Sequence, residues 1–222
     1  MRLNRNHHAG YTIDQTILIV AIIAILVTII IATVGWQLIG RTGGTKLAAQ
    51  FRQIEDAAGQ FYAEHFQWPH QAINLAGDTA AESRQVMYAL TGEHSGYNSS
   101  IDGGRLENYV SGFSVDNPGA AATARGLQHD FSSGANRLIY MWELPIPAAT
   151  GLGTGNYLIV EFENVPSTEA READEAVDGA VDSVVGRVFY RDTGTTCSGG
   201  GVPASATSSA IKNVCYAANI VQ

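Results

Sequence analysis

The fold is decided near the N-terminus by the stretch Thr16-Ile17-Leu18-Ile19-Val20-Ala21-Ile22-Ile23-Ala24-Ile25-Leu26-Val27-Thr28-Ile29-Ile30-Ile31-Ala32-Thr33-Val34. It contains no charged residue, and residues 35–39 extend it with further uncharged residues. About 18 or more consecutive apolar residues are enough for a helix to cross a bilayer. A secretory signal peptide has a shorter apolar region, of about 7–15 residues. We therefore expect a membrane-spanning helix over residues 11–39.

The residues in front of this stretch read Ala9-Gly10-Tyr11-Thr12-Ile13-Asp14-Gln15, after a short leader that carries Arg2 and Arg5. This order of Gly, aromatic residue, Thr, apolar residue and acid resembles the prepilin signal of type IV pilins and pseudopilins. In that family a prepilin peptidase cuts after the Gly, and the apolar helix becomes first a membrane anchor and then the core of a filament. The resemblance implies that residues 1–10 form a leader and that the mature chain begins at Tyr11, where the family is often methylated.

A plain signal anchor on an extracytoplasmic protein is the alternative. Hydropathy does not separate the two interpretations. The distribution of basic residues does not separate them either, because Arg2 and Arg5 precede the apolar stretch while Arg41 and Lys46 follow it closely. The order of residues at the start of the stretch favours the pilin interpretation.

One position departs from the family pattern. Pilins usually carry Glu at the fifth position after the cut, where it is thought to meet the charged N-terminus of a neighbouring subunit, but this chain has Gln15 there and Asp14 before it. A charge among apolar helices is costly unless it is paired. Either Asp14 neutralises an N-terminal amine, or this subunit does not need the contact. The second alternative suits a minor pilin at a filament tip, and we favour it.

Composition agrees with a secreted surface protein. The chain has 222 residues, a net charge of −8, 15% charged residues and 24 Gly. An acidic chain with scattered basic residues is not expected to bind nucleic acid. About 150 residues follow the N-terminal helix, which is enough for one domain with a substantial core.

The segment after the apolar stretch predicts a hinge and a second helix. Residues 40–46 contain three Gly, each of which weakens a helix by roughly 1 kcal/mol relative to Ala. Residues 47–68 then show apolar side chains at steps of four and three, which is the pattern of an amphipathic helix. Pro69 ends that helix. The apolar positions are Leu47, Phe51, Ile54, Ala58 and Phe61.

Residues 69–222 predict a mixed globular head. Ser167 is a suitable N-cap for a helix that ends near Asp182. The predicted fold class is α+β: a long N-terminal helix, membrane span plus amphipathic half, packed on a head with an antiparallel sheet. The other predicted elements are a helix over 80–90 and strands over 137–144, 156–165, 184–191 and 214–221.

No motif of catalysis is present in the sequence. There is no Gly-x-Ser-x-Gly elbow, no His-Glu-x-x-His and no phosphate-binding loop. The glycines of residues 151–155 precede a strand, which indicates a turn rather than a dinucleotide loop. The six His lack partners at metal-ligand spacing and are expected to be structural or exposed. We therefore expect no enzymatic activity, no cofactor and no metal.

The acidic stretch has two interpretations. Asp174, Asp178 and Asp182 lie at four-residue steps, so they share one face of a helix. Hard cations need several oxygens that converge from loops, which a straight helix face supplies poorly. A solvated outer face is favoured over a calcium site.

Cys197 and Cys215 are the only cysteines, and their spacing fits neither a redox motif nor a zinc site. They are either two buried free thiols or a disulfide, and an oxidising compartment beyond a membrane favours the disulfide. A C-terminal disulfide loop also resembles the exposed D-region of type IV pilins, which in that family contributes to subunit contacts or adhesion.

These observations together predict a structural subunit, a minor pilin, of a type IV pilus-like filament, anchored in the inner membrane by a single pass before it joins an extracellular or periplasmic filament. Its expected partners are other pilin subunits, the prepilin peptidase and the membrane. A pseudopilin of a type II secretion system is the alternative within this class. A signal-anchored periplasmic binding protein or enzyme is the alternative from another class.

Overall fold

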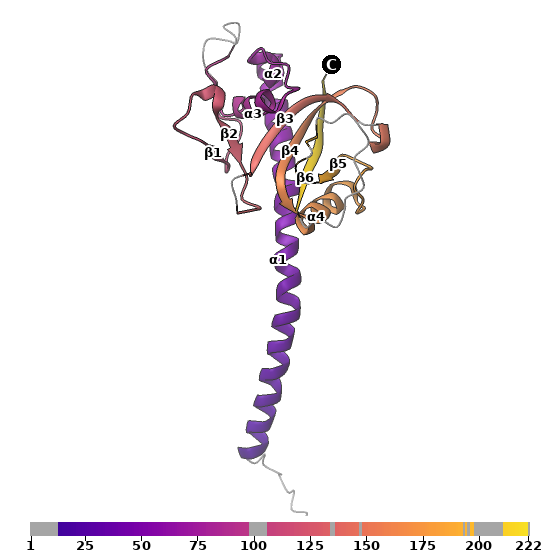
Figure 1. Cartoon of the computed structure of the whole chain (residues 1–222). Helices are drawn as coiled ribbons and strands as arrows, with labels where there is room; N and C mark the ends of the chain where they lie inside the picture. The colour runs from indigo at the N-terminus through magenta and orange to yellow at the C-terminus, as the bar shows by residue number, and fades with distance from the viewer. Residues whose placement is uncertain are drawn as a thin grey trace, which may run out of the picture. The chain divides into compact units, whose positions relative to one another are not determined.

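The computed structural model describes residues 13–97, 106–133, 136–146, 148–192, 194, 196–197 and 211–221. Within helices, the side chains of residues 14, 31–42 and 122 are also outside the description. The chain divides into two compact units, Met1–Gly40 and Arg41–Gln222 (Figure 1). The predicted leader and the predicted cleavage site, Gly10 and Tyr11, lie outside the described residues.

Helix α1, Ile13–His65, supplies all the described structure of the first unit. None of the helices formed by the described residues is both long enough and apolar enough to cross a membrane. The predicted membrane-spanning helix over 11–39 is therefore wrong, and the fold class is corrected to α+β without it. The predicted localisation, which began with a single-pass inner-membrane anchor, is wrong for the same reason.

The Gly-rich segment of residues 40–46 is helical in the structure, whereas a hinge was expected there. Gly43 and Gly44 let the backbone of helix α4, Ser167–Asp178, approach closely. A Cβ atom on Gly44 would lie only 2.1 Å from the Cβ of Glu172 and 3.0 Å from the backbone nitrogen of Ala173. These glycines therefore provide space for packing, and the contacts with α4 offset their low helix propensity.

The C-terminal half of α1 is the amphipathic helix that the sequence predicts. Its apolar positions, Leu47, Phe51, Ile54, Ala58 and Phe61, have no exposed surface. The helix ends at His65 because Phe66 adopts the left-handed conformation, with φ of 55°, and its N–H donates to the carbonyl oxygen of Tyr62 at 2.7 Å. A short helix α2, Pro69–Ala72, then begins at the proline that was expected to stop α1.

The second unit contains one antiparallel sheet of six strands in the order β1-β2-β3-β4-β6-β5. The four predicted strands are present. β1 and β2 were not predicted, because three residues are too few to show an alternating pattern. The strands are β1 Ser114–Asp116, β2 Gly126–Gln128, β3 Leu138–Pro145, β4 Asn156–Pro166, β5 Val188–Asp192 and β6 Ile211–Val221.

Beside α1 and α2, the described residues of this unit form helices α3 and α4 and two 3₁₀ turns. Helix α3, Ala80–Ala89, is capped by Thr79, whose hydroxyl accepts the N–H of Glu82. Helix α4 begins at Ser167 and ends at Asp178, because Gly179 takes a left-handed conformation with φ of 78°. The helix therefore ends four residues earlier than predicted, and its N-cap is Pro166 rather than the predicted Ser167. The 3₁₀ turns are η2, Ala122–Ala124, and η3, Ala148–Thr150.

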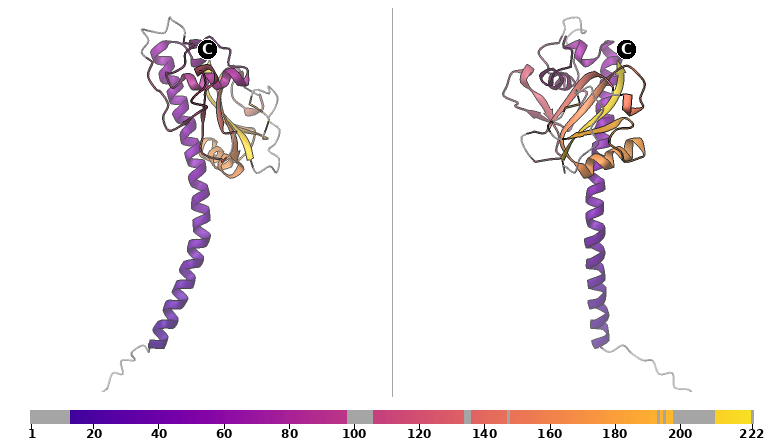
Figure 2. Two further views of the ribbon diagram at one scale, coloured as in Figure 1. Left: turned by 60° about the vertical axis from the view of Figure 1, so that its left-hand side comes forward. Right: turned by 45° about the vertical axis from the view of Figure 1, so that its right-hand side comes forward.

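The sheet has a separate core on each face. One face packs on the C-terminal half of α1 and on α3 (Figure 2), and there the ring of Phe51 stacks on Tyr216 at 4.8 Å and meets the edge of Phe162 at 5.3 Å. The opposite face carries a smaller apolar cluster that includes both cysteines. Its buried members are Trp142, Tyr157, Ile159, Phe189, Cys197, Cys215 and Ala217.

Candidate functional site

The apolar segment, defined here as Ile13–Ile30 of α1, exposes large apolar side chains along its length. Four consecutive residues, 17–20, are all exposed, and four residues at about 100° each reach every side of a helix. A helix that is apolar on every side is normally buried. The exposed large residues, at 44–79% of their surface, are Ile13, Ile17, Leu18, Ile19, Val20, Ile22, Ile23, Ile25, Leu26, Val27, Ile29 and Ile30.

Among the described side chains of this segment, few polar groups interrupt the apolar surface. The hydroxyl of Thr28 donates to the carbonyl oxygen of Ala24 at 2.7 Å, so its hydrogen bond is satisfied within the helix. Gln15 is exposed near the start of α1. The side chain of Asp14 lies outside the described residues, so the predicted roles of Asp14 and Gln15 in assembly stay predictions.

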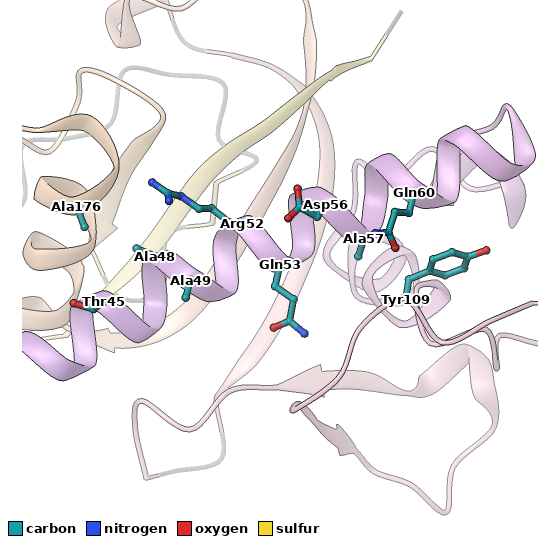
Figure 3. Close-up of a pocket in the computed structure, with 10 residues that line it drawn as sticks. All are labelled: Thr45, Ala48, Ala49, Arg52, Gln53, Asp56, Ala57, Gln60, Tyr109 and Ala176. Atoms are coloured by element: carbon teal, nitrogen blue, oxygen red, sulfur yellow. The ribbon is translucent and has the colours of Figure 1, made fainter.

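A shallow groove of about 660 Å³ follows the exposed side of α1 within the second unit (Figure 3). Small side chains of α1, including Ala48 and Ala49, line it, and Ala176 of α4 and Tyr109 lie toward its two ends. Its charged lining residues are Arg52 and Asp56, one helical turn apart. The groove is long and shallow, which suits contact with another protein surface better than enclosure of a small ligand.

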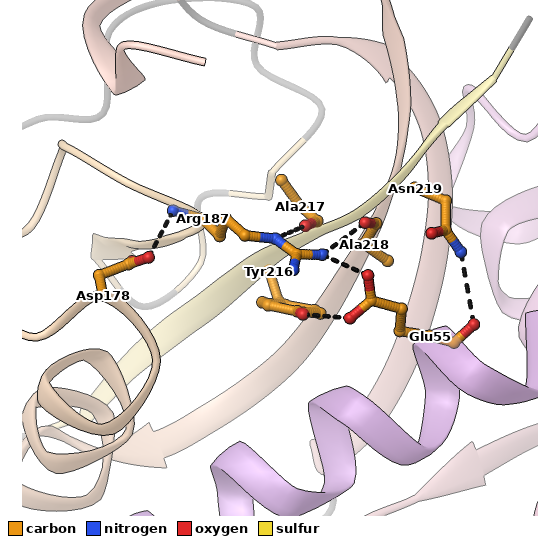
Figure 4. A network of polar contacts seen from close by, with 7 residues as sticks. All are labelled: Glu55, Asp178, Arg187, Tyr216, Ala217, Ala218 and Asn219. Carbon is orange, nitrogen blue, oxygen red and sulfur yellow. Dashed lines mark hydrogen bonds and ion pairs between the residues drawn. The ribbon is translucent and has the colours of Figure 1, made fainter. Parts of the chain in front are cut away.

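A polar network fastens α1 to the C-terminal strand (Figure 4). The carboxylate of Glu55 on α1 accepts two hydrogen bonds. Nη2 of Arg187 donates to one oxygen, and the hydroxyl of Tyr216 donates to the other. The guanidinium of Arg187 lies 4.7 Å from the centre of the Tyr216 ring and also donates to the carbonyl oxygens of Ala217 and Ala218. The network fixes both the rotation and the height of α1 against β6.

Cys197 and Cys215 form a disulfide in the structure, with their Cα atoms 6.1 Å apart. The buried carboxyl group of Glu161 lies beside it, in the core of the second apolar cluster. Burial raises the pKa of Glu161 to about 7, although hydrogen bonds from Cys197 and Trp142 act in the opposite direction. No sequence motif marks Glu161; the only signal was a charged residue within an apolar strand.

The three aspartates at four-residue steps do not form a solvated outer face. Asp174 is fully buried, and burial raises its pKa to about 7. The carboxylate of Asp178 accepts the backbone N–H of Arg187 at 3.1 Å and that of Val188 at 2.8 Å.

Asp182 accepts the N–H groups of Val184 and Val185, and Asp174 accepts the N–H of Asp182. The aspartates therefore shape the loop between α4 and β5. Among the described residues, no group of three or more His, Cys, Asp or Glu side chains is placed to hold a metal ion.

The buried histidines have structural contacts. His129 lies within 2.6 Å of the carbonyl oxygen of Glu163, and burial lowers its pKa to about 4. Nε2 of His70 lies 2.5 Å from the carboxylate of Glu143, and burial lowers the pKa of His70 as well. His7 and His8 are outside the described residues.

Comparisons with known proteins add no relative: no protein-family model, curated protein or solved structure matches this chain. The resemblance to type IV pilins therefore rests on the order of residues 9–15 and on the apolar run behind them.

Proposed function

We propose that the chain is a structural subunit of a type IV pilus-like filament, in which the apolar segment Ile13–Ile30 packs against the same segment of neighbouring subunits. The observation that carries the proposal is the exposure of apolar side chains on every side of this segment. Complete burial of one Ile or Leu side chain stabilises by about 1.5–3 kcal/mol. A segment with so many half-exposed apolar side chains thus supplies enough free energy to drive assembly.

The shape of the apolar surface favours several neighbours over one. A single partner helix covers one stripe of a helix, as in a two-stranded coiled coil, and leaves the opposite face in water. The apolar segment has no polar face among its described side chains from Ile17 to Val27. A helix with several neighbouring helices buries such a surface, and the array of subunits in a filament provides that arrangement.

Gln15 favours a minor subunit over a major one. A subunit inside the array would place its N-terminal amine among apolar helices, where an unpaired charge is costly. Gln15 offers hydrogen bonds but no charge to neutralise that amine. A subunit at the tip of the filament has no neighbour on one side, and the missing charge is tolerated there. Asp14→Asn should then leave incorporation unchanged, which counting subunits per filament would test.

Two matched substitutions test the proposal. Ile23 in the apolar segment and Ile220 on β6 are exposed to nearly the same extent, 52% and 51%. Ile23→Lys should prevent assembly of the full chain, because a charge would be buried between subunits. Ile220→Lys should leave assembly intact. The amount of each variant in filaments from its native cells, relative to its amount in the whole cells, provides the measurement. Equal assembly of the two variants, at the level of the unmodified chain, would overturn the proposal.

A further inference from the structure

The environment of Glu161 combines three hydrogen bonds at one buried side chain. Its Oε2 atom accepts the indole N–H of Trp142 at 2.8 Å and the backbone N–H of Cys197 at 3.0 Å. Its Oε1 atom accepts the side-chain amide of Asn213 at 3.1 Å. A buried acceptor of this kind is held in one place, so whatever donates to it is held in place as well.

The other cysteine is adjacent to the same residue through the sheet. Glu161 of β4 and Cys215 of β6 are direct partners in the antiparallel ladder. Directly opposed residues point to the same face, with Cβ atoms about 4.5–5.5 Å apart. Glu161 therefore bonds to the backbone of one cysteine and stands beside the side chain of the other.

Two bonds thus hold Cys197 against the paired residues Glu161 and Cys215 of the sheet. One is the sulfur–sulfur bond to Cys215, and the other is the hydrogen bond from its N–H to Glu161. The hydrogen bond to Glu161 does not depend on the disulfide, so it can form while both cysteines are reduced. The strand that carries Glu161 is held in the sheet by backbone hydrogen bonds to β3 and β6.

We propose that Glu161 is a positioning residue for the disulfide: it holds the backbone of Cys197 within reach of the Cys215 thiol before the sulfur–sulfur bond forms. The inference is independent of the filament proposal. With Glu161 in place, the two thiols behave as a pair at high effective concentration, so oxidation is favoured. Without it, the chain entropy of the segment that carries Cys197 opposes closure.

The chemical step is a thiol–disulfide exchange with a small-molecule disulfide as the oxidant. One cysteine thiolate attacks the oxidant, whose sulfur–sulfur bond breaks and releases one small thiol. The second cysteine thiolate attacks the protein sulfur of the mixed disulfide and displaces the other small thiol. The two cysteines lose two electrons, the oxidant gains them, and the protons leave on the two small thiols.

The test is the equilibrium of the full chain with oxidised and reduced glutathione at pH 8, while circular dichroism verifies that the reduced protein stays folded. Glu161→Leu removes the acceptor at similar volume and should lower the equilibrium constant for disulfide formation at least about tenfold, since a hydrogen bond to a charged group is lost. Glu161→Gln should stay within about threefold of the unmodified chain, because its amide oxygen can still accept the N–H of Cys197.

Trp142→Phe separates positioning from general stability. It removes another donor to the same Oε2 atom and disturbs the same cluster, but leaves the bond to Cys197. It should lower Tm but change the equilibrium constant for disulfide formation by less than about twofold. That change is much smaller than the fall of about tenfold expected for Glu161→Leu. An effect of Trp142→Phe as large as that of Glu161→Leu, or no effect of Glu161→Leu, would overturn the proposal.

A second measurement decides the matter if Glu161→Leu does not fold when reduced. Amide hydrogen exchange of Cys197 is followed in the reduced, unmodified protein. Protection of this N–H shows that Cys197 is held without the disulfide, as proposed. Exchange at the rate of an open chain would refute it.

Discussion

Glu55 and Arg187 form an ion pair in which Oε1 and Nη2 are 2.5 Å apart, although 132 residues separate them in sequence. Glu55 lies on α1, and Arg187 directly precedes β5, an edge strand of the sheet, so the pair joins the helix to that edge of the sheet. Their side chains are 22% and 36% exposed, which reduces screening by water compared with a surface pair.

This ion pair should show measurable coupling in a double-mutant cycle. Glu55→Gln and Arg187→Met, alone and combined, should give an interaction energy of about 1–2 kcal/mol in urea unfolding. The exposed pair Lys46–Asp130, at 3.9 Å, serves as the control and should couple by less than about 0.5 kcal/mol. Equal coupling of the two pairs would contradict the assignment of a structural role to Glu55.

Two glycines of α1 should respond to Ala in opposite directions. Gly44→Ala places a Cβ 2.1 Å from that of Glu172 and should destabilise by about 1–3 kcal/mol, because α4 has to move. No atom lies within 4 Å of a Cβ on Gly59, so Gly59→Ala should stabilise by about 1 kcal/mol through helix propensity. Thermal unfolding of both variants is the measurement. A stabilising Gly44→Ala would show that α4 does not pack as described.

Glu161 should make the stability of the chain depend on pH between about 4 and 7. Burial raises its pKa to about 7 in the folded protein, so below pH 7 the folded protein holds a proton that the unfolded chain, with a pKa near 4.3, has released. Its contribution to stability is complete below the unfolded pKa and is lost as the pH rises through the folded pKa.

The measurement compares the unmodified chain with Glu161→Gln, because buried His129, whose pKa is lowered to about 4, acts in the opposite sense. The difference in unfolding free energy should shift in favour of the unmodified chain by about 2 kcal/mol between pH 8 and pH 5. Replacement of the exposed Glu107 by Gln is the control. A constant difference for Glu161→Gln would be inconsistent with a raised pKa.

Loss of the disulfide should destabilise the second unit. Cys197 and Cys215 are 18 residues apart, and closure of a loop of this size is worth about 3 kcal/mol on the chain-entropy model. The double substitution of both cysteines by Ala should lower unfolding free energy by that amount. If urea unfolding of this variant matched that of the oxidised chain, the disulfide would have no stabilising role.

Processing at the N-terminus is the most direct check on the pilin resemblance. If a prepilin peptidase acts on the chain, the mature protein begins at Tyr11, and Gly10→Val blocks the cleavage. Mass spectrometry of the protein from its native cells gives the first residue. A filament-associated protein that still begins with Met1 would argue against the resemblance.

The sequence by itself determined the elements whose patterns are local. Apolar residues recur at steps of four and three along the second half of α1, so both this helix and its buried face could be predicted from the sequence. These residues are Leu47, Phe51, Ile54, Ala58 and Phe61. The same holds for the long apolar strand β4, and for the two cysteines, which had few alternatives in pairing.

Only the tertiary structure decided what each exceptional residue does. Gly43 and Gly44 weaken a helix taken alone, but the approach of α4 makes them a packing site. Asp174 was expected on a solvated helix face, but it is buried and hydrogen-bonded to Tyr190. No motif marked Glu161, whose partners Cys197 and Asn213 lie 36 and 52 residues away in sequence. β1 and β2 are too short to show a pattern and exist through their pairing. The physical reason is common to all of them. Periodicity in the sequence indicates which face of one element is buried, whereas backbone contacts between elements and buried polar contacts depend on which other element packs against that face.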